Sequence, residues 1–228
     1  MNQLSANSND YELPIIKYKC EHSTLFFTRY FFYKKTQRKF VIGEHHKLIC
    51  DALDKVLNGE ITRLIINIAP RYGKTELSVK NFIAKGLSIN PSARFIHLSY
   101  SDDLALDNSD EVREMVKSEE FTQLYPDVKI KPNSDSKKKW YTTKNGGVYA
   151  TSAAGQVTGF GAGQVDEEDF IIENSHKFAG ALIIDDPIKP EDGDSEVQRE
   201  RINQRYDSTI KNRVNSRKTP IIIIMQRI

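Results

Sequence analysis

The chain has 228 residues, of which 39% are hydrophobic and 28% are charged. This is ordinary globular composition, with enough apolar residues for one sizeable core. The formal net charge is only +2, so the whole-chain charge does not indicate a nucleic-acid-binding protein. No apolar run approaches the roughly 20 residues that span a bilayer. The composition therefore excludes a protein that crosses the membrane as helices, and we expect no membrane partner.

The cysteines and the N-terminus indicate where the protein works. Cys20 and Cys50 have neither metal-ligand spacing nor a disulfide-rich pattern, which favours a reducing, intracellular setting. The polar N-terminus, Met1–Asp10, lacks the apolar centre of a signal peptide. We expect it to be a frayed tail.

Five short apolar runs are predicted to be strands. Most of them are continuously apolar rather than alternating, which is typical of a sheet that is covered on both faces. Because helix-like stretches lie between them, the sequence predicts an α/β fold with right-handed crossovers, a mostly parallel central sheet flanked by helices and a three-layer sandwich. The expected strands are Leu64–Ala69, Phe95–Tyr100, Gly147–Thr151, Ala181–Asp185 and Pro220–Met225, and the expected helices are Glu76–Leu87, Leu104–Ser118 and Ser195–Asn215.

The segment Leu25–Phe40 is unusually aromatic. Its aromatic side chains form no amphipathic stripe, so we expect it to pack on the core across the sheet edge, with an adenine-binding role as the alternative. Glu44–Gly59 is predicted to be a helix that ends at Gly59, and the polar, basic stretch Lys131–Lys144 to be a loop or an insertion. We therefore divide the chain into a tail with the aromatic segment at 1–40 and one main domain at 41–228.

The most informative residues are Ile68–Glu76, which follow an apolar run and lead into a predicted helix. A buried strand, a tight turn that ends in Gly-Lys-Thr and a helix start together form the phosphate loop of nucleoside triphosphatases. The N–H groups of such a turn and the helix dipole attract phosphate. Gly73 permits close backbone approach, Lys74 can reach the β- and γ-phosphates, and the Thr75 hydroxyl can bind Mg²⁺.

This phosphate loop departs from the pattern G-x-x-x-x-G-K-[ST]. Ile68 stands where the first glycine belongs, and Pro70 and Arg71 occupy the loop. The alternative interpretation is a surface turn that contains Gly-Lys-Thr by chance. A second motif favours the phosphate loop, because it lies where a nucleotide site would need it.

The second motif is the apolar run Ala181–Ile184, which ends in Asp185 and Asp186. In phosphate-loop enzymes a strand near the loop delivers one acid to the Mg²⁺ shell, and a following acid can polarise water for attack on the γ-phosphate. Asp186 stands where many such enzymes have glutamate. Pro187 is expected to hold Asp186 in an extended backbone conformation. The alternative is an ordinary strand that ends in an Asp-Asp turn.

Two further segments belong to the predicted site. The isoleucine run 221–224 is expected at the centre of the sheet, and Gln226 follows it at the strand end. Gln226 can contact the γ-phosphate or the attacking water, or it can simply be a polar residue where a strand leaves the core. The glycine-rich segment Gly155–Gly163 is predicted to be a mobile loop near the site, with a plain flexible connection as the alternative.

These motifs, in this order, resemble the ATPase domain of phage large terminase subunits. The resemblance rests on Ile66–Glu76, Leu98–Ser101, the Thr158-Gly159 within Gly155–Gly163, Gly180–Pro190 and Ile224–Arg227, and it spans about Phe40 to the C-terminus. Similar proteins often lack the first loop glycine and carry an arginine in the loop. Such proteins have a P-loop fold of the additional-strand (ASCE) type and drive double-stranded DNA into an empty capsid by hydrolysing ATP with Mg²⁺.

The resemblance implies a role for each matching residue. Asp186 matches the catalytic acid, Arg71 the arginine that stabilises or senses the γ-phosphoryl group, Lys74 the phosphate-binding lysine and Gln226 the coupling motif. Nucleotide contacts are implied for Pro70, Arg71, Tyr72, Gly73, Lys74, Thr75 and Glu76, and Mg²⁺ contacts for Thr75 and Asp185.

The resemblance also implies partners and a setting. These are double-stranded DNA, a portal protein, a small terminase subunit and further copies of the chain in a ring, in the host cytoplasm. Terminases continue into a nuclease domain, which is absent from this sequence, so we expect a fragment without nuclease activity. A helicase-like, nucleic-acid-stimulated ATPase of related fold and a nucleotide-binding module that has lost hydrolysis are the alternatives.

The sequence places the DNA contacts and a trans-acting arginine less well. Candidate DNA contacts are the basic and aromatic run Lys137–Tyr141 and the long helix Ser195–Asn215, although mixed charges make a solvated face the simpler interpretation of that helix. Arg113 and Arg213 are the candidates for an arginine that enters a neighbouring subunit's site, on expected exposure alone.

Overall fold

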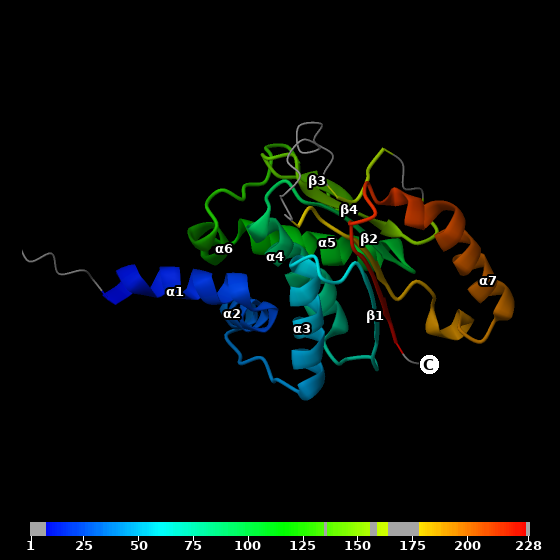
Figure 1. Ribbon diagram of the computed structural model, residues 1–228, viewed down its shortest axis with the longest axis horizontal. Coiled ribbons are helices and arrows are strands. Elements are labelled where there is room, and N and C mark those ends of the chain that lie inside the picture. The colour runs from blue at the N-terminus through cyan, green and yellow to red at the C-terminus, as the bar shows by residue number, and fades with distance from the viewer. Residues whose placement is uncertain (1–7, 135, 156–158, 164–177, 227–228) are drawn as a thin grey trace, which may run out of the picture.

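The structure is a computed structural model of the chain, and it describes residues 8–134, 136–155, 159–163 and 178–226. Within these residues, six strands form one sheet in the order β1-β6-β5-β2-β4-β3 (Figure 1). All neighbouring pairs are parallel except β3 and β4, which are antiparallel. The strands are β1 (Arg63–Asn67), β2 (Arg94–Ser99), β3 (Lys139–Tyr141), β4 (Gly147–Ser152), β5 (Leu182–Asp185) and β6 (Ile221–Met225).

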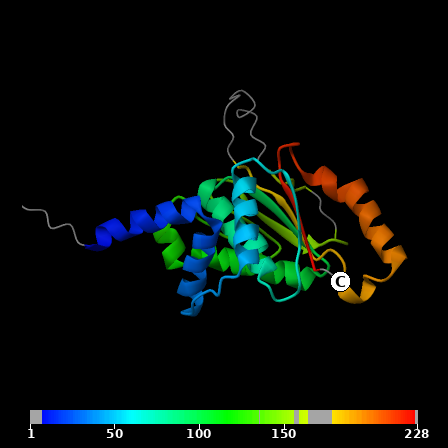
Figure 2. The ribbon, with the colours of Figure 1, turned by 60° about the horizontal axis from the view of Figure 1, so that its bottom comes forward.

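Helices cover both faces of this sheet, very unequally (Figure 2). The larger core lies between the sheet and the helices α2 to α6, and a smaller core lies on the other face around Phe160 and Ile210. The helices are α1 (Ser8–His22), α2 (Thr24–Thr36), α3 (Glu44–Leu57), the π-helix η1 (Glu76–Asn81), α4 (Phe82–Ile89), α5 (Asp102–Lys117), α6 (Glu119–Leu124), η2 (Pro190–Asp192), α7 (Glu196–Arg205), η3 (Tyr206–Ile210) and η4 (Lys211–Arg213). In the part of the chain with described coordinates, no helix combines the length and apolarity that a membrane crossing requires.

The predicted α/β fold with a mostly parallel sheet is confirmed. The isoleucine-rich strand β6 is an interior strand between β1 and β5, but it lies next to the edge strand rather than at the predicted centre of the sheet. Strand β6 therefore separates β1, which the phosphate loop follows, from β5, which ends in the two acids. An additional strand at this position fits the expected fold type. Strand β1 lies at the sheet edge and has exposed side chains at alternate positions, so it is not covered on both faces.

Several predicted elements differ from the observed ones. The stretch Lys131–Lys144 is not only a loop, because its Trp140 is buried and anchors the short antiparallel strand β3. The helix predicted at Ser195–Asn215 is confirmed over residues 196–213, but it is not one regular α-helix: α7 continues directly into the π-helix η3 and the 3₁₀-helix η4. Within the predicted helix Glu76–Leu87, the first six residues are π-helical. The N-terminal tail was drawn too long, because Ser8–Asp10 already belong to α1, while residues 1–7 lie outside the described residues.

The aromatic segment belongs to the core, as predicted, but not across the sheet edge. Phe27 and Phe31 on α2 are buried, and α2 packs against α1, α3 and the π-helix η1 with α4. Aromatic side chains on several sides of a helix are useful where the helix is surrounded by other helices. Both α2 and α3 therefore pack against η1, the helix that follows the phosphate loop.

A buried ion pair fixes this helical layer. Lys85 of α4 has a side chain only 1% exposed, and its Nζ donates to Asp54 Oδ1 of α3 over 2.7 Å. Asp54 also accepts hydrogen bonds from the backbone N–H and the hydroxyl of Thr24 at the start of α2. Burial lowers the pKa of Lys85, and Asp54 opposes that shift. One carboxylate thus ties together three helices, α2, α3 and α4.

Because removal of one partner leaves a buried charge unpaired, Asp54→Ala is expected to lower the free energy of unfolding by about 3 kcal/mol. Lys85→Met removes the charge and keeps an apolar stem, so its effect should be smaller. Urea denaturation of both single variants and of the double variant measures the coupling. Strictly additive losses would show that the ion pair does not hold the layer together.

Candidate active site

The predicted site residues come from three strands that end at the same edge of the sheet. The phosphate loop follows β1, Asp185 and Asp186 lie at the end of β5, and Gln226 follows β6. Because these strands are parallel, their carboxyl ends meet at one edge, which is where α/β proteins bind ligands. A hollow of about 330 Å³ lies there, lined by Pro70, Arg71, Gly73, Lys74, Thr75, Glu76, Asp186 and Gln226.

The lysine and the second acid of the predicted site are in direct contact. Lys74 Nζ lies 2.6 Å from Asp186 Oδ1, and the lysine side chain is only 8% exposed. The two residues come from different motifs that are more than one hundred positions apart. A cation and an acid that face each other in a hollow can both reach a ligand bound there.

The second pair of the site lies directly beside the first. The Thr75 hydroxyl donates to Asp185 Oδ2 over 2.7 Å. The other carboxylate oxygen, Asp185 Oδ1, is buried and has no hydrogen-bond partner in the described structure. Burial raises the pKa of Asp185 to about 6, the Thr75 hydrogen bond opposes that shift, and the negative charge of Asp186 adds to it.

An unpartnered carboxylate oxygen beside a threonine hydroxyl is the donor set expected for Mg²⁺. Mg²⁺ prefers oxygen ligands and usually takes one or two carboxylates together with substrate phosphates and water, rather than an all-protein cage. The described residues contain no group of three or more His, Cys, Asp or Glu that could hold a metal by themselves. The residues present therefore fit a Mg²⁺ ion that is completed by a nucleotide.

Two of the five described non-glycine residues with positive φ lie at this edge. Arg71, Gly73 and Asp186 have φ values of 67°, 75° and 46°, in the left-handed region that side chains other than glycine rarely adopt. The expectation that Pro187 holds Asp186 in an extended conformation is therefore wrong. An Asp tolerates the left-handed region better than most residues.

Hydrogen bonds on every side hold Asp186 in this conformation. Its N–H donates to the carbonyl of Ile224 over 2.8 Å, and its carbonyl accepts from the N–H of Tyr100 over 2.9 Å. Its Oδ1 accepts from the N–H of Gln226 over 3.0 Å, in addition to the contact with Lys74. Gln226 thus contacts Asp186 through its backbone N–H and is one of the residues that line the hollow.

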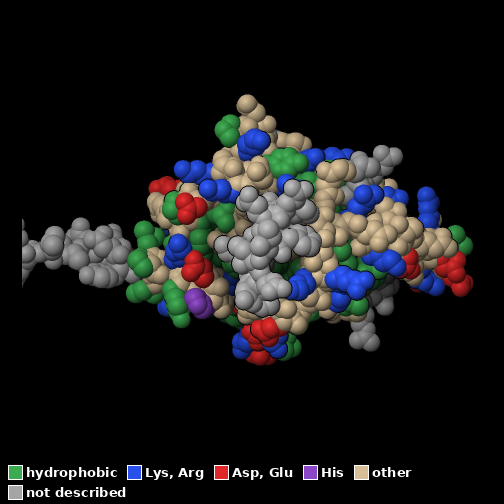
Figure 3. All heavy atoms as spheres, turned by 45° about the horizontal axis from the view of Figure 1, so that its top comes forward, with side chains coloured by type: hydrophobic (Ala, Val, Ile, Leu, Met, Phe, Trp, Pro, Cys, Tyr) green, Lys and Arg blue, Asp and Glu red, His purple; other side chains and the backbone are tan. Residues whose placement is uncertain are grey.

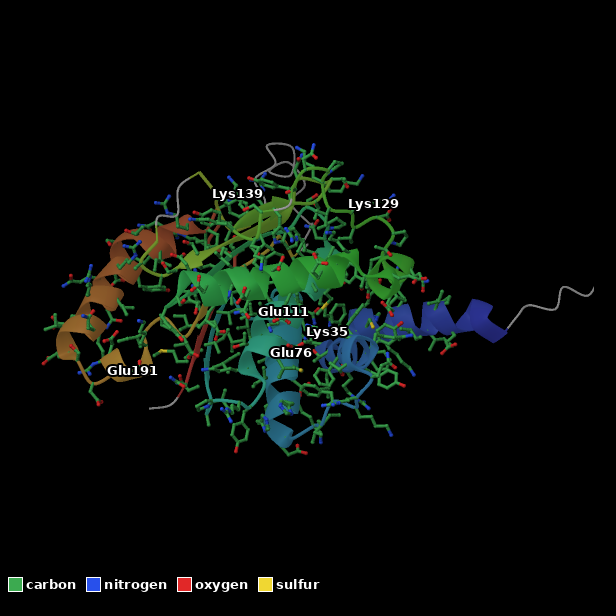
Figure 4. The ribbon with its side chains drawn as sticks, turned by 180° about the vertical axis from the view of Figure 1, so that it is seen from behind. Lys35, Glu76, Glu111, Lys129, Lys139 and Glu191 are labelled. Atoms are coloured by element: carbon green, nitrogen blue, oxygen red, sulfur yellow. The ribbon has the colours of Figure 1, made fainter. Side chains whose placement is uncertain are left out.

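The residue that follows Thr75 is engaged in the π-helix. Asn81 Nδ2 donates to the carbonyl and to Oε1 of Glu76, over 2.8 and 2.9 Å. Figure 4 shows Glu76 of η1, Glu111 of α5 and Lys35 of α2 close together. Glu111 pairs with Lys35 and also with Lys80, whose Nζ lies 2.7 Å from Glu111 and 3.8 Å from Glu76. Glu76 lines the hollow, but its carboxylate is held by groups of its own helix.

Tyr72 is the predicted nucleotide contact that does not line the hollow. Its side chain is 51% exposed, and its ring lies edge-on to that of His45, with 5.2 Å between the ring centres. The neighbouring His46 is buried and approaches the Tyr72 carbonyl. His46 is not among the site residues predicted from the sequence. The available signal was its position three residues after Gly43, at the start of a helix.

The glycine-rich segment is better packed than predicted. Residues 156–158 lie outside the described residues, so the expected mobile loop cannot be followed there. Beyond them, Phe160 and Ala162 are buried, and Ala162 exchanges backbone hydrogen bonds with Arg213 and Asn215. For residues 159–163 the predicted mobile loop is therefore wrong. The small residues of this segment let it pack close to η4.

The candidate DNA contacts and trans-acting arginines find little support. Trp140 is buried with its Nε1 donating to Ser109, and Lys137 is paired with Asp107 and Asp110 of α5. Arg113 is buried and bonded to Asp110, so its choice by exposure was wrong, and Arg213 is half-buried in η4. On the face in Figure 3, Lys and Arg side chains are scattered rather than gathered into one patch.

The raised pKa of Asp185 predicts how stability depends on pH. Between the unfolded pKa near 4 and the folded pKa near 6, the native state binds the proton more tightly, so protonation stabilises the fold at low pH and this contribution is lost as the pH rises through about 6. Asp185→Asn should therefore raise the unfolding free energy of the nucleotide-free, Mg²⁺-free protein at pH 8 by on the order of 2 kcal/mol. Thermal unfolding at pH 8 and pH 4.5 tests this. The gain must shrink at the lower pH, and a constant gain would contradict the assigned pKa.

No protein-family model and no curated protein matches the chain. Among solved structures, the chain is similar to the crystal structure of the HK97 bacteriophage large terminase, with a TM-score of 0.52 and 17% sequence identity. The match covers 91% of this chain and 37% of the terminase chain, so this chain spans well under half of the protein that it resembles. At this identity the likeness shows the fold alone: the chain has a terminase-like α/β fold.

Proposed function

We propose that the chain is the Mg²⁺-dependent ATPase domain of a viral genome-packaging terminase, which couples ATP hydrolysis to movement of double-stranded DNA into a procapsid. The observation that carries the proposal is the convergence of Lys74, Thr75 and Asp186 on one hollow at the carboxyl edge of the sheet, with the buried Asp185 bonded to Thr75 beside it. The terminase-like fold supports the same proposal.

Each residue has a role in the proposed reaction. Lys74 leaves Asp186 and binds the β- and γ-phosphates, while the N–H groups of the loop surround the triphosphate. Thr75 and Asp185 hold Mg²⁺, which when bound neutralises phosphate charge. Asp186, once released by Lys74, polarises a water molecule. The water oxygen then bonds to the γ-phosphorus as the bond to the β-phosphate oxygen breaks, and a proton of that water passes to Asp186, giving ADP and phosphate.

Two residues extend this arrangement. Arg71 lines the hollow from a left-handed position in the loop, from which its guanidinium can neutralise charge on the transferring phosphoryl group. The N–H of Gln226 donates to the Asp186 carboxylate. A movement of this carboxylate therefore acts directly on the backbone at the end of β6. We assign Gln226 to the coupling of hydrolysis to movement.

The partners follow from the proposed function. We propose that the chain acts on double-stranded DNA in the host cytoplasm, in a ring of identical subunits that docks on a portal protein and receives DNA from a small terminase subunit. The Lys and Arg side chains on the face shown in Figure 3 are scattered and do not mark a DNA path there.

The direct test of the proposal is ATP turnover by purified protein, with and without double-stranded DNA. Lys74→Ala removes the cation that meets the phosphates, so phosphate release should fall by about 100-fold or more. Lys117→Ala is the matched control, because Lys117 is an exposed lysine at the end of α5. Unchanged turnover in Lys74→Ala, or none in the wild-type chain with DNA, would refute the ATPase assignment.

Asp186→Asn separates binding from chemistry. The substitution removes the carboxylate that holds Lys74 over 2.6 Å, so ADP should bind several-fold more tightly. Loss of the group that polarises water should slow hydrolysis by about 100-fold or more. Calorimetric titration with ADP and single-turnover hydrolysis measure the two effects. Full activity would return Asp186 to the role of an ordinary turn residue.

A further inference from the structure

His46 is a buried polar residue that the proposed reaction does not use. It lies in the first turn of α3, and its ring is packed against Phe40 and His45, with ring centres 5.0 and 3.8 Å away. Both of its ring nitrogens are within hydrogen-bond distance of other groups. A buried histidine with both nitrogens engaged can hold two chain segments in a fixed relation.

The hydrogen bonds fix the tautomer of His46. The N–H of Gly43 donates to Nδ1 over 2.9 Å, so Nδ1 is unprotonated and Nε2 carries the hydrogen. Nε2 lies 3.2 Å from the carbonyl of Tyr72 and 2.9 Å from His45 Nε2, and it can donate to either. Burial and the neighbouring His45 lower the pKa of His46, which keeps the ring neutral.

The contact with Tyr72 lies in the part of the phosphate loop where the backbone turns through two left-handed residues. Tyr72 stands between Arg71 and Gly73, both of which are left-handed. A Cβ added at Gly73 would lie 3.2 Å from His46 Nε2 and 3.9 Å from the Phe40 ring. The ring of His46 therefore lies directly against the turn that lines the hollow.

We infer that His46 is a positioning residue for the phosphate loop, and that its Nε2–H bond to the Tyr72 carbonyl holds the loop ready for the diphosphate part of a nucleotide. The inference rests on the proposed function, because it assumes that the hollow binds nucleotide. It adds a group from outside the nucleotide motifs to the site. It also gives α3 a role, since its first turn carries the support.

Two substitutions separate this role from simple helix capping. The Asn side chain places an oxygen where Nδ1 lies, so His46→Asn keeps the acceptor for Gly43 and loses the donor for Tyr72. The Gln side chain can place an N–H group where Nε2 lies, so His46→Gln keeps the donor for Tyr72 and loses the cap. His22→Asn is the control, because His22 is an exposed histidine at the end of α1.

The first measurement is calorimetric titration with ADP. His46→Asn should weaken ADP binding about 3- to 10-fold, the range for one neutral hydrogen bond, while its melting temperature stays near that of the wild type. His46→Gln should bind ADP within about 2-fold of the wild type and melt a few degrees lower. The reverse pattern would make His46 a helix cap only and would overturn the inference.

Two further readouts keep the inference separate from the proposed function. In the nucleotide-free protein, amide hydrogen exchange at residues 69–76 should be faster in His46→Asn than in the wild type or His46→Gln. If the wild-type chain binds no nucleotide, the proposed function fails, and this exchange still tests the loop contact. Inorganic pyrophosphate should lose affinity in His46→Asn as ADP does; a loss for ADP alone would place the ring against the base and contradict the inference.

Discussion

The ion pair between Lys74 and Asp186 is the contact on which the rest of the site depends. It joins the loop after β1 to the end of β5, across strand β6, which lies between them. The N–H of Gln226, which follows β6, donates to the same carboxylate oxygen of Asp186. The contact keeps both side chains at the hollow that they line. Triphosphate would compete with the carboxylate for the lysine, so nucleotide binding and release of the acid become one event.

The sequence predicted the parts of the site that short motifs determine. Gly73-Lys74-Thr75 and the strand ending in Asp185-Asp186 required only local patterns and the rule that parallel strands end at one edge. The backbone of Asp186 was not predictable from Pro187, because its left-handed conformation is imposed by Ile224, Tyr100 and Gln226, which are distant in sequence. Tertiary contacts of this kind leave no local signal.

The same limit explains the errors in the fold. Strand β3 lies in a basic stretch, and its Trp140 is buried against α5, where it donates a hydrogen bond to Ser109. The local sequence Lys137-Lys138-Lys139 contains no signal that predicts this packing on α5. The π-helix η1 is stabilised by the side chain of Asn81 reaching Glu76. His46 escaped notice because a histidine in a helix is usually a packing or surface residue, and only its three-dimensional neighbours connect it to the phosphate loop.

The most direct test of the account is a crystal structure of the chain with Mg²⁺ and a non-hydrolysable ATP analogue. The account predicts a triphosphate in the hollow, Lys74 Nζ on the β- and γ-phosphate oxygens instead of Asp186, and a metal between Thr75 and Asp185. An analogue bound elsewhere, such as the hollow between Arg63 and Arg217 at the other end of the strands, would contradict it. So would a bound nucleotide that leaves the 2.6 Å contact between Lys74 and Asp186 intact.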